Sequence, residues 1–262
     1  MDFLAPLTPY LEAGAPMIYL IGAVFARISA IVFLAPGFGE RAVPARVRLA
    51  AAIGITMVLA PMVLTPGMTP PDTLAEIVSL YAAETMSGLL IGFALRMFIF
   101  ILQIVGALAA QNMSLSQLFG PTVGFDSESP FAALLVMAGV ALAASAGVHL
   151  YLVGALADAY EALPFGLFPG AEAAGEWSAM RVGQALMKSL ALSSPFVILG
   201  FLYSLALAAV ARAMPQLMAA FVGAPAITLL GMALFAASAP IILFDWLAGF
   251  QRALLDLFAG AM

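Results

Sequence analysis

Six long apolar stretches run through this sequence and restrict its fold more than any other feature. Proline, glycine and charged residues separate them, and they extend from Met17 to Ala35, Val47 to Leu64, Leu74 to Ala110, Phe131 to Leu156, Ala185 to Ala211, and Leu217 to Phe250. Each can hold at least one helix of about 20 residues, the length that crosses a ~30 Å hydrocarbon layer. With 65% hydrophobic and 9% charged residues, the chain is too apolar for a soluble domain. The sequence therefore predicts an all-α integral membrane protein with about six long apolar helical stretches.

Basic residues predict the orientation of these helices. A six-pass topology places two connections on the same side of the membrane, and these connections contain Arg41, Arg46, Arg48 and Arg212. Because short loops rich in Lys and Arg tend to stay in the cytoplasm, we expect this side to be cytoplasmic. The proline-rich segment from Thr65 to Thr73 and the acidic segment from Asp158 to Glu176 then lie on the outer side.

Several ionisable residues lie inside or at the edges of the apolar stretches: Arg27, Glu84, Arg96, Asp158, Arg212 and Asp245. A charged side chain left bare in hydrocarbon costs about 2.5 to 3.5 kcal/mol on insertion scales. These residues must therefore be paired, hydrated or turned toward protein. Arg27 and Glu84 are one pair that could form across two helices.

The third apolar stretch is too long for a simple crossing. As one continuous helix it would reach about 55 Å at 1.5 Å per residue, so it must protrude, break or bury part of itself. Glu84, Gly88, Gly92 and Arg96 follow one another at intervals of four along it, and the two glycines allow another backbone to come close. Two interpretations stay open for this flank of the helix: packing within the chain's own bundle, and contact with another subunit.

A polar segment interrupts the apolar stretches between Gln111 and Pro130, with the sequence QNMSLSQLFGPTVGFDSESP. Such a segment cannot continue a membrane helix, and irregular backbone at membrane depth must reach water or be enclosed by protein. It is either a solvated cytoplasmic loop or a re-entrant segment that occupies a channel. The absence of Lys and Arg from it, on a side where basic residues are expected, favours the second interpretation.

The sequence offers little chemistry of other kinds. It has no cysteine and one histidine, His149, which excludes disulfides and a multi-histidine metal site. No catalytic motif occurs, so we expect neither an enzyme nor a cofactor, and a net charge of -5 leaves no basic surface for nucleic acid. A bond from His149 to a neighbouring helix is the favoured interpretation, and pH sensing is the alternative.

A series of landmarks occurs in a fixed order along the chain. It comprises Arg27 to Gly39 (RISAIVFLAPGFG), Val43 to Arg48, Glu84 with Gly88 and Gly92, Gly106 with Gln111, Gly147 to His149, Leu163 to Gly166, Ala211 to Leu217, and Gly223 to Pro225. In order and spacing over most of the chain, these landmarks resemble the FliR family of flagellar export-gate proteins and its relatives in virulence-type injectisomes.

The resemblance implies a fold, partners and a location. Residues 1–180 would be a FliP-like part and residues 181–262 a FliQ-like helical hairpin, with tilted helices. The chain would assemble with FliP-like and FliQ-like subunits and an FlhB-like subunit in the bacterial inner membrane, at the flagellar basal body and partly on the periplasmic side. Polar and small residues would then face sister subunits: Arg27, Glu84, Gly88, Gly92, Arg96, His149, Arg212, Pro215 and Gln216.

The resemblance also implies a role for the polar segment, as a plug that restricts the conduit until unfolded export substrates pass. Its candidate residues are Gln111, Asn112, Met113, Leu115, Leu118, Phe119, Gly120, Pro121 and Gly124. The methionine, leucine and phenylalanine side chains would supply soft apolar contacts against ion leak, and the glycines and proline would set the turn. Where the family commonly has Asp-Pro, this chain has Gly120–Pro121, so the local shape of the loop is expected to differ.

Three classes of function follow from these observations. The favoured hypothesis is a structural and gating subunit of a protein-export channel, in a flagellum or in an injectisome. A secondary transporter is the second, because intramembrane Arg and Glu suit a substrate or proton path, but no clear inverted repeat relates the two halves. An intramembrane enzyme is the third and weakest, since no catalytic constellation is present.

Overall fold

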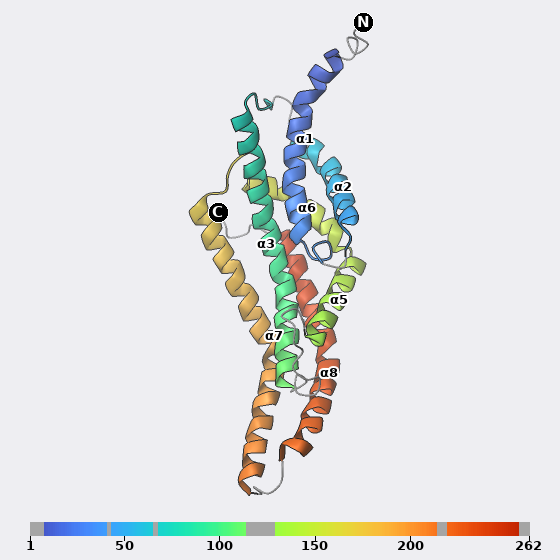
Figure 1. Cartoon of the computed structure of the whole chain (residues 1–262), viewed down its shortest axis with the longest axis vertical. Coiled ribbons are helices and arrows are strands. Elements are labelled where there is room, and N and C mark those ends of the chain that lie inside the picture. Colours follow the sequence, from blue (N-terminus) through green and yellow to red (C-terminus); the bar gives the residue numbers. More distant parts are fainter. Residues whose placement is uncertain (1–7, 41–42, 65–67, 114–128, 214–218, 257–262) are drawn as a thin grey trace. The chain divides into compact units, whose positions relative to one another are not determined.

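The described part of the chain is helical with short connections. The computed structural model describes residues 8–40, 43–64, 68–113, 129–213 and 219–256 (Figure 1). Its helices are α1 (Thr8–Leu34), α2 (Ala45–Val63), α3 (Leu74–Asn112), α5 (Pro130–Ser145), α6 (Val148–Ala162), α7 (Ala171–Ala213) and α8 (Ala219–Leu255). Five helices in these ranges are long and apolar enough to cross a membrane, or up to six spans if α5 and α6 count as one. The predicted all-α membrane fold is confirmed.

Several predicted stretches differ from the observed helices, and the fourth and fifth differ most clearly. The stretch from Phe131 to Leu156 is broken between α5 and α6, where Gly147 adopts a φ of 71°. This left-handed conformation is open to glycine at little cost and ends a right-handed helix. In addition, α7 begins at Ala171, earlier than the predicted start at Ala185. Part of the acidic segment from Asp158 to Glu176, which was predicted only to lie on the outer side, is therefore helical.

The over-long third stretch is one unbroken helix, α3, of 39 residues. At its start, the Glu76 N–H donates to Thr73 Oγ1 at 3.3 Å, and Glu76 Oε2 accepts from the Asp72 N–H at 2.9 Å. This arrangement is close to a capping box, which satisfies donors that a helix start leaves without partners. In an apolar 18-residue part of α3, 56% of the residues are buried, the largest share among the corresponding parts of the candidate spans. Burial, and not a break, accommodates its length.

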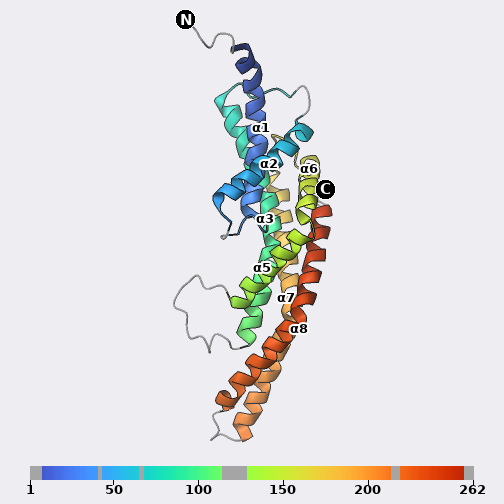
Figure 2. The ribbon, with the colours of Figure 1, turned by 90° about the vertical axis from the view of Figure 1, so that its right-hand side faces the viewer.

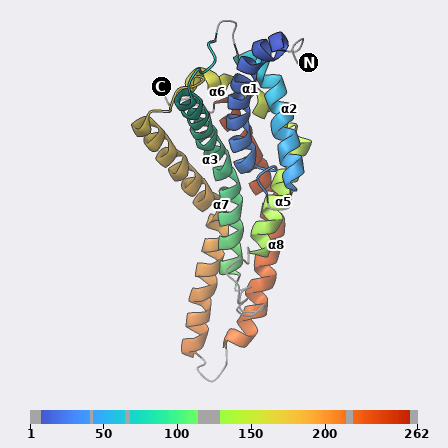
Figure 3. The same ribbon diagram turned by 45° about the horizontal axis from the view of Figure 1, so that its top comes forward.

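The chain divides into two compact units that alternate along the sequence. Unit 1 comprises Met1–Arg96, Gly147–Arg181 and Gln251–Met262, and unit 2 comprises Met97–Ala146 and Val182–Phe250. In unit 1, α1 packs on α2 and α2 packs on α6, and Figure 3 shows α1 beside α2. The core of this unit consists of apolar side chains removed from solvent, among them Val24, Ile28, Ile31, Leu59, Ile91, Leu152 and Leu156.

Unit 2 contains an antiparallel hairpin made by α7 and α8, which Figure 2 shows side by side. Lys188 of α7 pairs with Asp245 of α8. Further along, the rings of Phe196 and Phe235 lie 6.2 Å apart. The partners thus move backward along α8 as they move forward along α7, which is the register of a hairpin.

A proline inside α7 removes one backbone N–H donor, but the carbonyl that this donor would have bonded still has a partner. Pro195 has no N–H to give to the carbonyl of Ala191, four residues earlier. The hydroxyl of Ser194 donates to that carbonyl at 2.8 Å. A serine next to the proline therefore replaces the missing bond, which matters most where no water is available.

Candidate functional site

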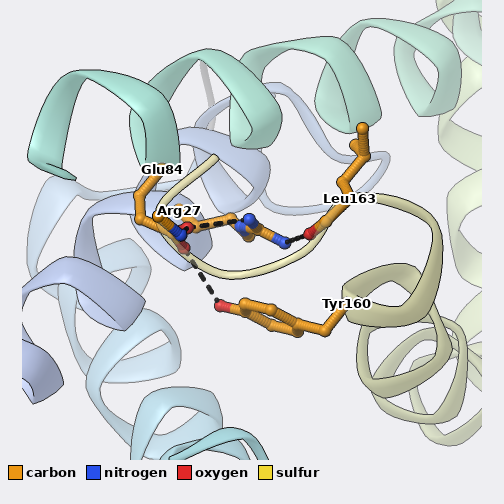
Figure 4. Close-up of polar contacts among 5 residues, drawn as sticks. Arg27, Glu84, Tyr160 and Leu163 are labelled. Carbon is orange, nitrogen blue, oxygen red and sulfur yellow. Dashed lines mark hydrogen bonds and ion pairs between the residues drawn. The ribbon is translucent and has the colours of Figure 1, made fainter. Parts of the chain in front are cut away.

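A buried ion pair joins α1 to α3 in unit 1. Arg27 Nη2 donates to Glu84 Oε1 at 2.8 Å, and the two side chains are only 1% and 0% exposed. They come from helices that are distant in sequence and adjacent in space (Figure 4). The pair that the sequence suggested does form.

The end of α6 and the turn that follows it complete this charge cluster. Arg27 Nη1 donates to the carbonyl of Leu163 at 2.9 Å, and the N–H of Gly166 donates to Glu84 Oε1 at 2.8 Å. The Arg27 guanidinium lies 3.9 Å from the centre of the Tyr160 ring, whose hydroxyl points at Glu84 Oε2 at 3.5 Å (Figure 4). Gly166 has a φ of 76°, so a side chain there would strain the turn.

These contacts explain how two charges persist in the interior. Taking an ion pair out of water costs several kcal/mol per ion unless further hydrogen bonds satisfy both partners. Here a backbone carbonyl and a backbone N–H supply such bonds, and an aromatic face stabilises the cation. The cluster of Arg27, Glu84, Tyr160, Leu163 and Gly166 therefore holds α1, α3 and the turn after α6 in one arrangement.

The close approach of α1 to α3 depends on two glycines of the row predicted from the sequence. A Cβ added to Gly88 would lie 2.4 Å from the Arg27 carbonyl oxygen, and one added to Gly92 would lie 2.9 Å from Leu34 Cβ. Both glycines, like Glu84, are buried against the chain's own α1. On this flank the structure contains packing within the bundle, one of the two interpretations left open. Contact of these residues with a sister subunit stays a prediction.

Adding a methyl group at Gly88 is expected to destabilise the protein by about 1 to 3 kcal/mol, because a backbone atom occupies the space and α1 must move away from α3. The measurement is thermal unfolding of the detergent-solubilised protein with Gly88→Ala. Gly54→Ala is the matched control, since nothing lies within 4 Å of its added Cβ. That control is expected to gain about 0.5 to 1 kcal/mol from helix propensity. Equal changes in unfolding temperature in the two variants would contradict the role of Gly88 in the close packing of α1 on α3.

A second charge cluster fixes the connection between α1 and α2. Arg96 Nη1 donates to Glu40 Oε1 at 2.9 Å, and Arg48 Nη2 donates to the backbone carbonyl of Glu40 at 2.8 Å. The Arg96 and Glu40 side chains are 22% and 23% exposed. This pair is therefore more hydrated than the first and is expected to contribute less to stability.

The remaining predicted interface residues are dispersed. His149 is exposed near the start of α6, and Arg212 is exposed in the last turn of α7. A bond from His149 to a neighbouring helix, the favoured interpretation, stays a prediction. Pro215 and Gln216 lie outside the described residues. A role of the exposed residues in subunit contacts stays a prediction.

The start of the predicted plug segment is anchored in unit 2 at the end of α3. Gln111 is exposed, whereas Met113 is fully buried. A Cβ added to Gly231 of α8 would lie 2.3 Å from Met113 Cγ, and Thr228 of α8 donates to the Met113 carbonyl at 3.4 Å. A Cβ added to Gly200 of α7 would likewise lie 2.3 Å from Asn112 Oδ1. The last turn of α3 is therefore held between both helices of the hairpin.

The other end of this segment returns to the same helix. Ser129 Oγ donates to the Gly106 carbonyl at 3.2 Å. A Cβ added to Gly106 would lie 2.3 Å from Ala132 Cα, so α5 crosses α3 at backbone contact. Both ends of the segment are thus fixed to α3 within one unit. The predicted plug residues Leu115, Leu118, Phe119, Gly120, Pro121 and Gly124 lie outside the described residues.

Sequence reasoning missed several residues that build these sites. Tyr160, Gly200 and Gly231 were not singled out as contacts, although glycine inside an apolar helix is itself a signal of close approach. The Leu163 carbonyl and Gly166 N–H act through their backbones. In the described ranges no group of three His, Asp or Glu residues could hold a metal ion.

Comparison with known proteins finds a matching family and several similar proteins. Residues 18–253 match the family described as bacterial export proteins, family 1. The chain is similar to the flagellar biosynthetic protein FliR of Caulobacter vibrioides, at 31% identity over 248 residues that cover 94% of this chain and 98% of that protein. It is also similar to FliR of Pectobacterium carotovorum, at 28% identity with 83% of each chain covered, and of Escherichia coli, at 27% with 82% of each covered.

Proposed function

Because the chain belongs to the FliR family of bacterial export proteins, we propose that it is a structural and gating subunit of the flagellar protein-export channel. Membership makes it a component of a flagellar export apparatus, and its apolar helices suit the inner membrane. The relatives named above are all called flagellar, which favours a flagellar role over an injectisome.

The proposed assembly contains FliP-like and FliQ-like subunits, with an FlhB-like subunit at the cytoplasmic face. Residues 1–180 would correspond to a FliP-like part and residues 181–262 to a FliQ-like hairpin, with part of the assembly on the periplasmic side. The large exposed apolar surface of α2 supports partnership, since this helix has few buried residues on its own. Such surface must be covered by lipid or by protein.

The gating role is carried by one observation, the anchoring of both ends of the segment between Met113 and Ser129. Because both of its ends are held on one helix, such a segment can occupy a conduit and remain attached next to it. Because it begins and ends in packed helices, it can be displaced while the surrounding bundle stays in place. The segment would restrict the channel at rest and yield to an unfolded export substrate.

Purification from native membranes in mild detergent tests the assembly. We expect FliP-like and FliQ-like proteins to be recovered with the chain, identified by mass spectrometry of the intact complex. A deletion strain complemented with the chain should regain motility. The chain isolated alone, stable and monodisperse, would contradict the proposal, and solute uptake by such a preparation would favour a secondary transporter.

A further inference from the structure

The hairpin of unit 2 is marked by charges at two levels. Lys188 and Asp245 form an ion pair between α7 and α8, with side chains 35% and 41% exposed. Arg212 is exposed in the last turn of α7. No charged residue occurs in α7 between Lys188 and Arg212, or between Arg212 and Asp245. The part of the hairpin between these two levels therefore contains no charged residue, and a charge lies at each of its ends.

The length of this uncharged middle matches a bilayer. The stretch from Ser189 to Ala211 is about 35 Å long at 1.5 Å per residue, close to the ~30 Å of hydrocarbon that a membrane helix must cross. The whole of α7 has 43 residues and would reach about 65 Å. Only part of α7 can therefore lie in hydrocarbon, and the charges indicate which part.

The surface between the two charged levels is apolar and exposed. On α7 it includes Val197, Ile198, Phe201, Leu202 and Leu205, and on α8 it includes Leu229, Leu230, Met232, Ile241 and Phe244. Two serine hydroxyls on it are satisfied internally, since Ser194 and Ser204 both donate to carbonyls of their own helix. An apolar surface whose serine hydroxyls bond within their own helix suits acyl chains.

We propose that the Lys188–Asp245 pair marks the level at which this hairpin leaves the hydrocarbon, opposite Arg212, and that the exposed apolar surface between these levels contacts lipid. The residues of α7 that precede Lys188 then lie in polar surroundings. Pairing lets two charges sit at this boundary, where a partly exposed ion pair keeps access to water and headgroups. If Arg212 is cytoplasmic, the pair lies at the periplasmic surface.

Nitroxide labels can test this boundary, because the chain contains no cysteine of its own. Single cysteines replace Ala179, Met187 and Phe201, which are exposed on α7, and Ser193, which is buried. The labelled chain is purified with its native partners, whose own cysteines are removed, and reconstituted in phosphatidylcholine and phosphatidylglycerol vesicles. Collision rates are measured with O₂, which concentrates in hydrocarbon, and with a neutral nickel chelate, which stays in water.

We expect the ratio of O₂ to nickel accessibility to be several-fold higher at position 201 than at 179, with 187 between them. Position 193 should be shielded from both reagents. Nickel access at 201 would overturn the proposal in favour of a water-lined surface. Shielding of 201 from both reagents, as at 193, would overturn it in favour of a protein partner.

Removing both charges gives an independent test. In Lys188→Leu combined with Asp245→Leu, the uncharged stretch becomes longer, and we expect nickel accessibility at position 187 to fall several-fold. If the ion pair only fastens α7 to α8, nickel accessibility at position 187 would stay unchanged. Such a result would contradict the boundary role. The inference does not rest on export, so motility is recorded separately for each variant.

Discussion

Replacing Arg27 with methionine is expected to destabilise the protein by about 3 to 5 kcal/mol, the range observed when one partner of a buried ion pair is removed. The variant leaves the Glu84 carboxylate buried without its cation. It also leaves the Leu163 carbonyl without its donor. We expect a large drop in the unfolding temperature of the solubilised protein, and the variant should no longer be recovered with the proposed partner subunits.

A double variant distinguishes the loss of a partner from the loss of packing. Arg27→Met combined with Glu84→Leu removes both charges, and it is expected to recover much of the stability, because the uncompensated ion is gone. Arg96→Met serves as the comparison, since its side chain is 22% exposed and its loss should cost less. A double variant no more stable than Arg27→Met alone would contradict this account.

Removing the segment between Met113 and Ser129, with a short glycine–serine linker left to join the anchored ends, is expected to make the membrane leaky to small ions when the channel is open. The proposed plug supplies apolar side chains that seal irregular gaps, and the linker does not. Conductance across planar bilayers that contain the purified assembly is the measurement. Unchanged conductance in a variant that still assembles and exports would rule out the gating role.

A milder variant keeps the segment and disturbs only its anchor. Gly231→Leu places a side chain where Met113 packs, and it is expected to raise resting conductance without abolishing assembly. Gly249→Leu on the same helix is the matched control, because nothing lies within 4 Å of its added Cβ. Equal conductance in the two variants would show that the anchor does not govern the seal.

The sequence alone determined the class of the protein and the chemistry of its interior. Helix length against bilayer thickness depends only on counting apolar residues, so the membrane fold could be predicted before any contact was known. The pairing of Arg27 with Glu84 could be suggested for a similar reason, since an unpaired charge has few alternatives in an apolar bundle. The close approach at Gly88 could be suggested from its spacing to Gly92.

The groups that complete each site became evident from the three-dimensional contacts. The Leu163 carbonyl and the Gly166 N–H belong to the backbone, which is the same in every residue, so no sequence pattern distinguishes them as partners of Arg27 and Glu84. The break in the helix at Gly147 could not be predicted either, because the sequence is apolar on both sides of this glycine. Composition sets how much surface must avoid water, whereas the packing of particular helices sets which atoms meet.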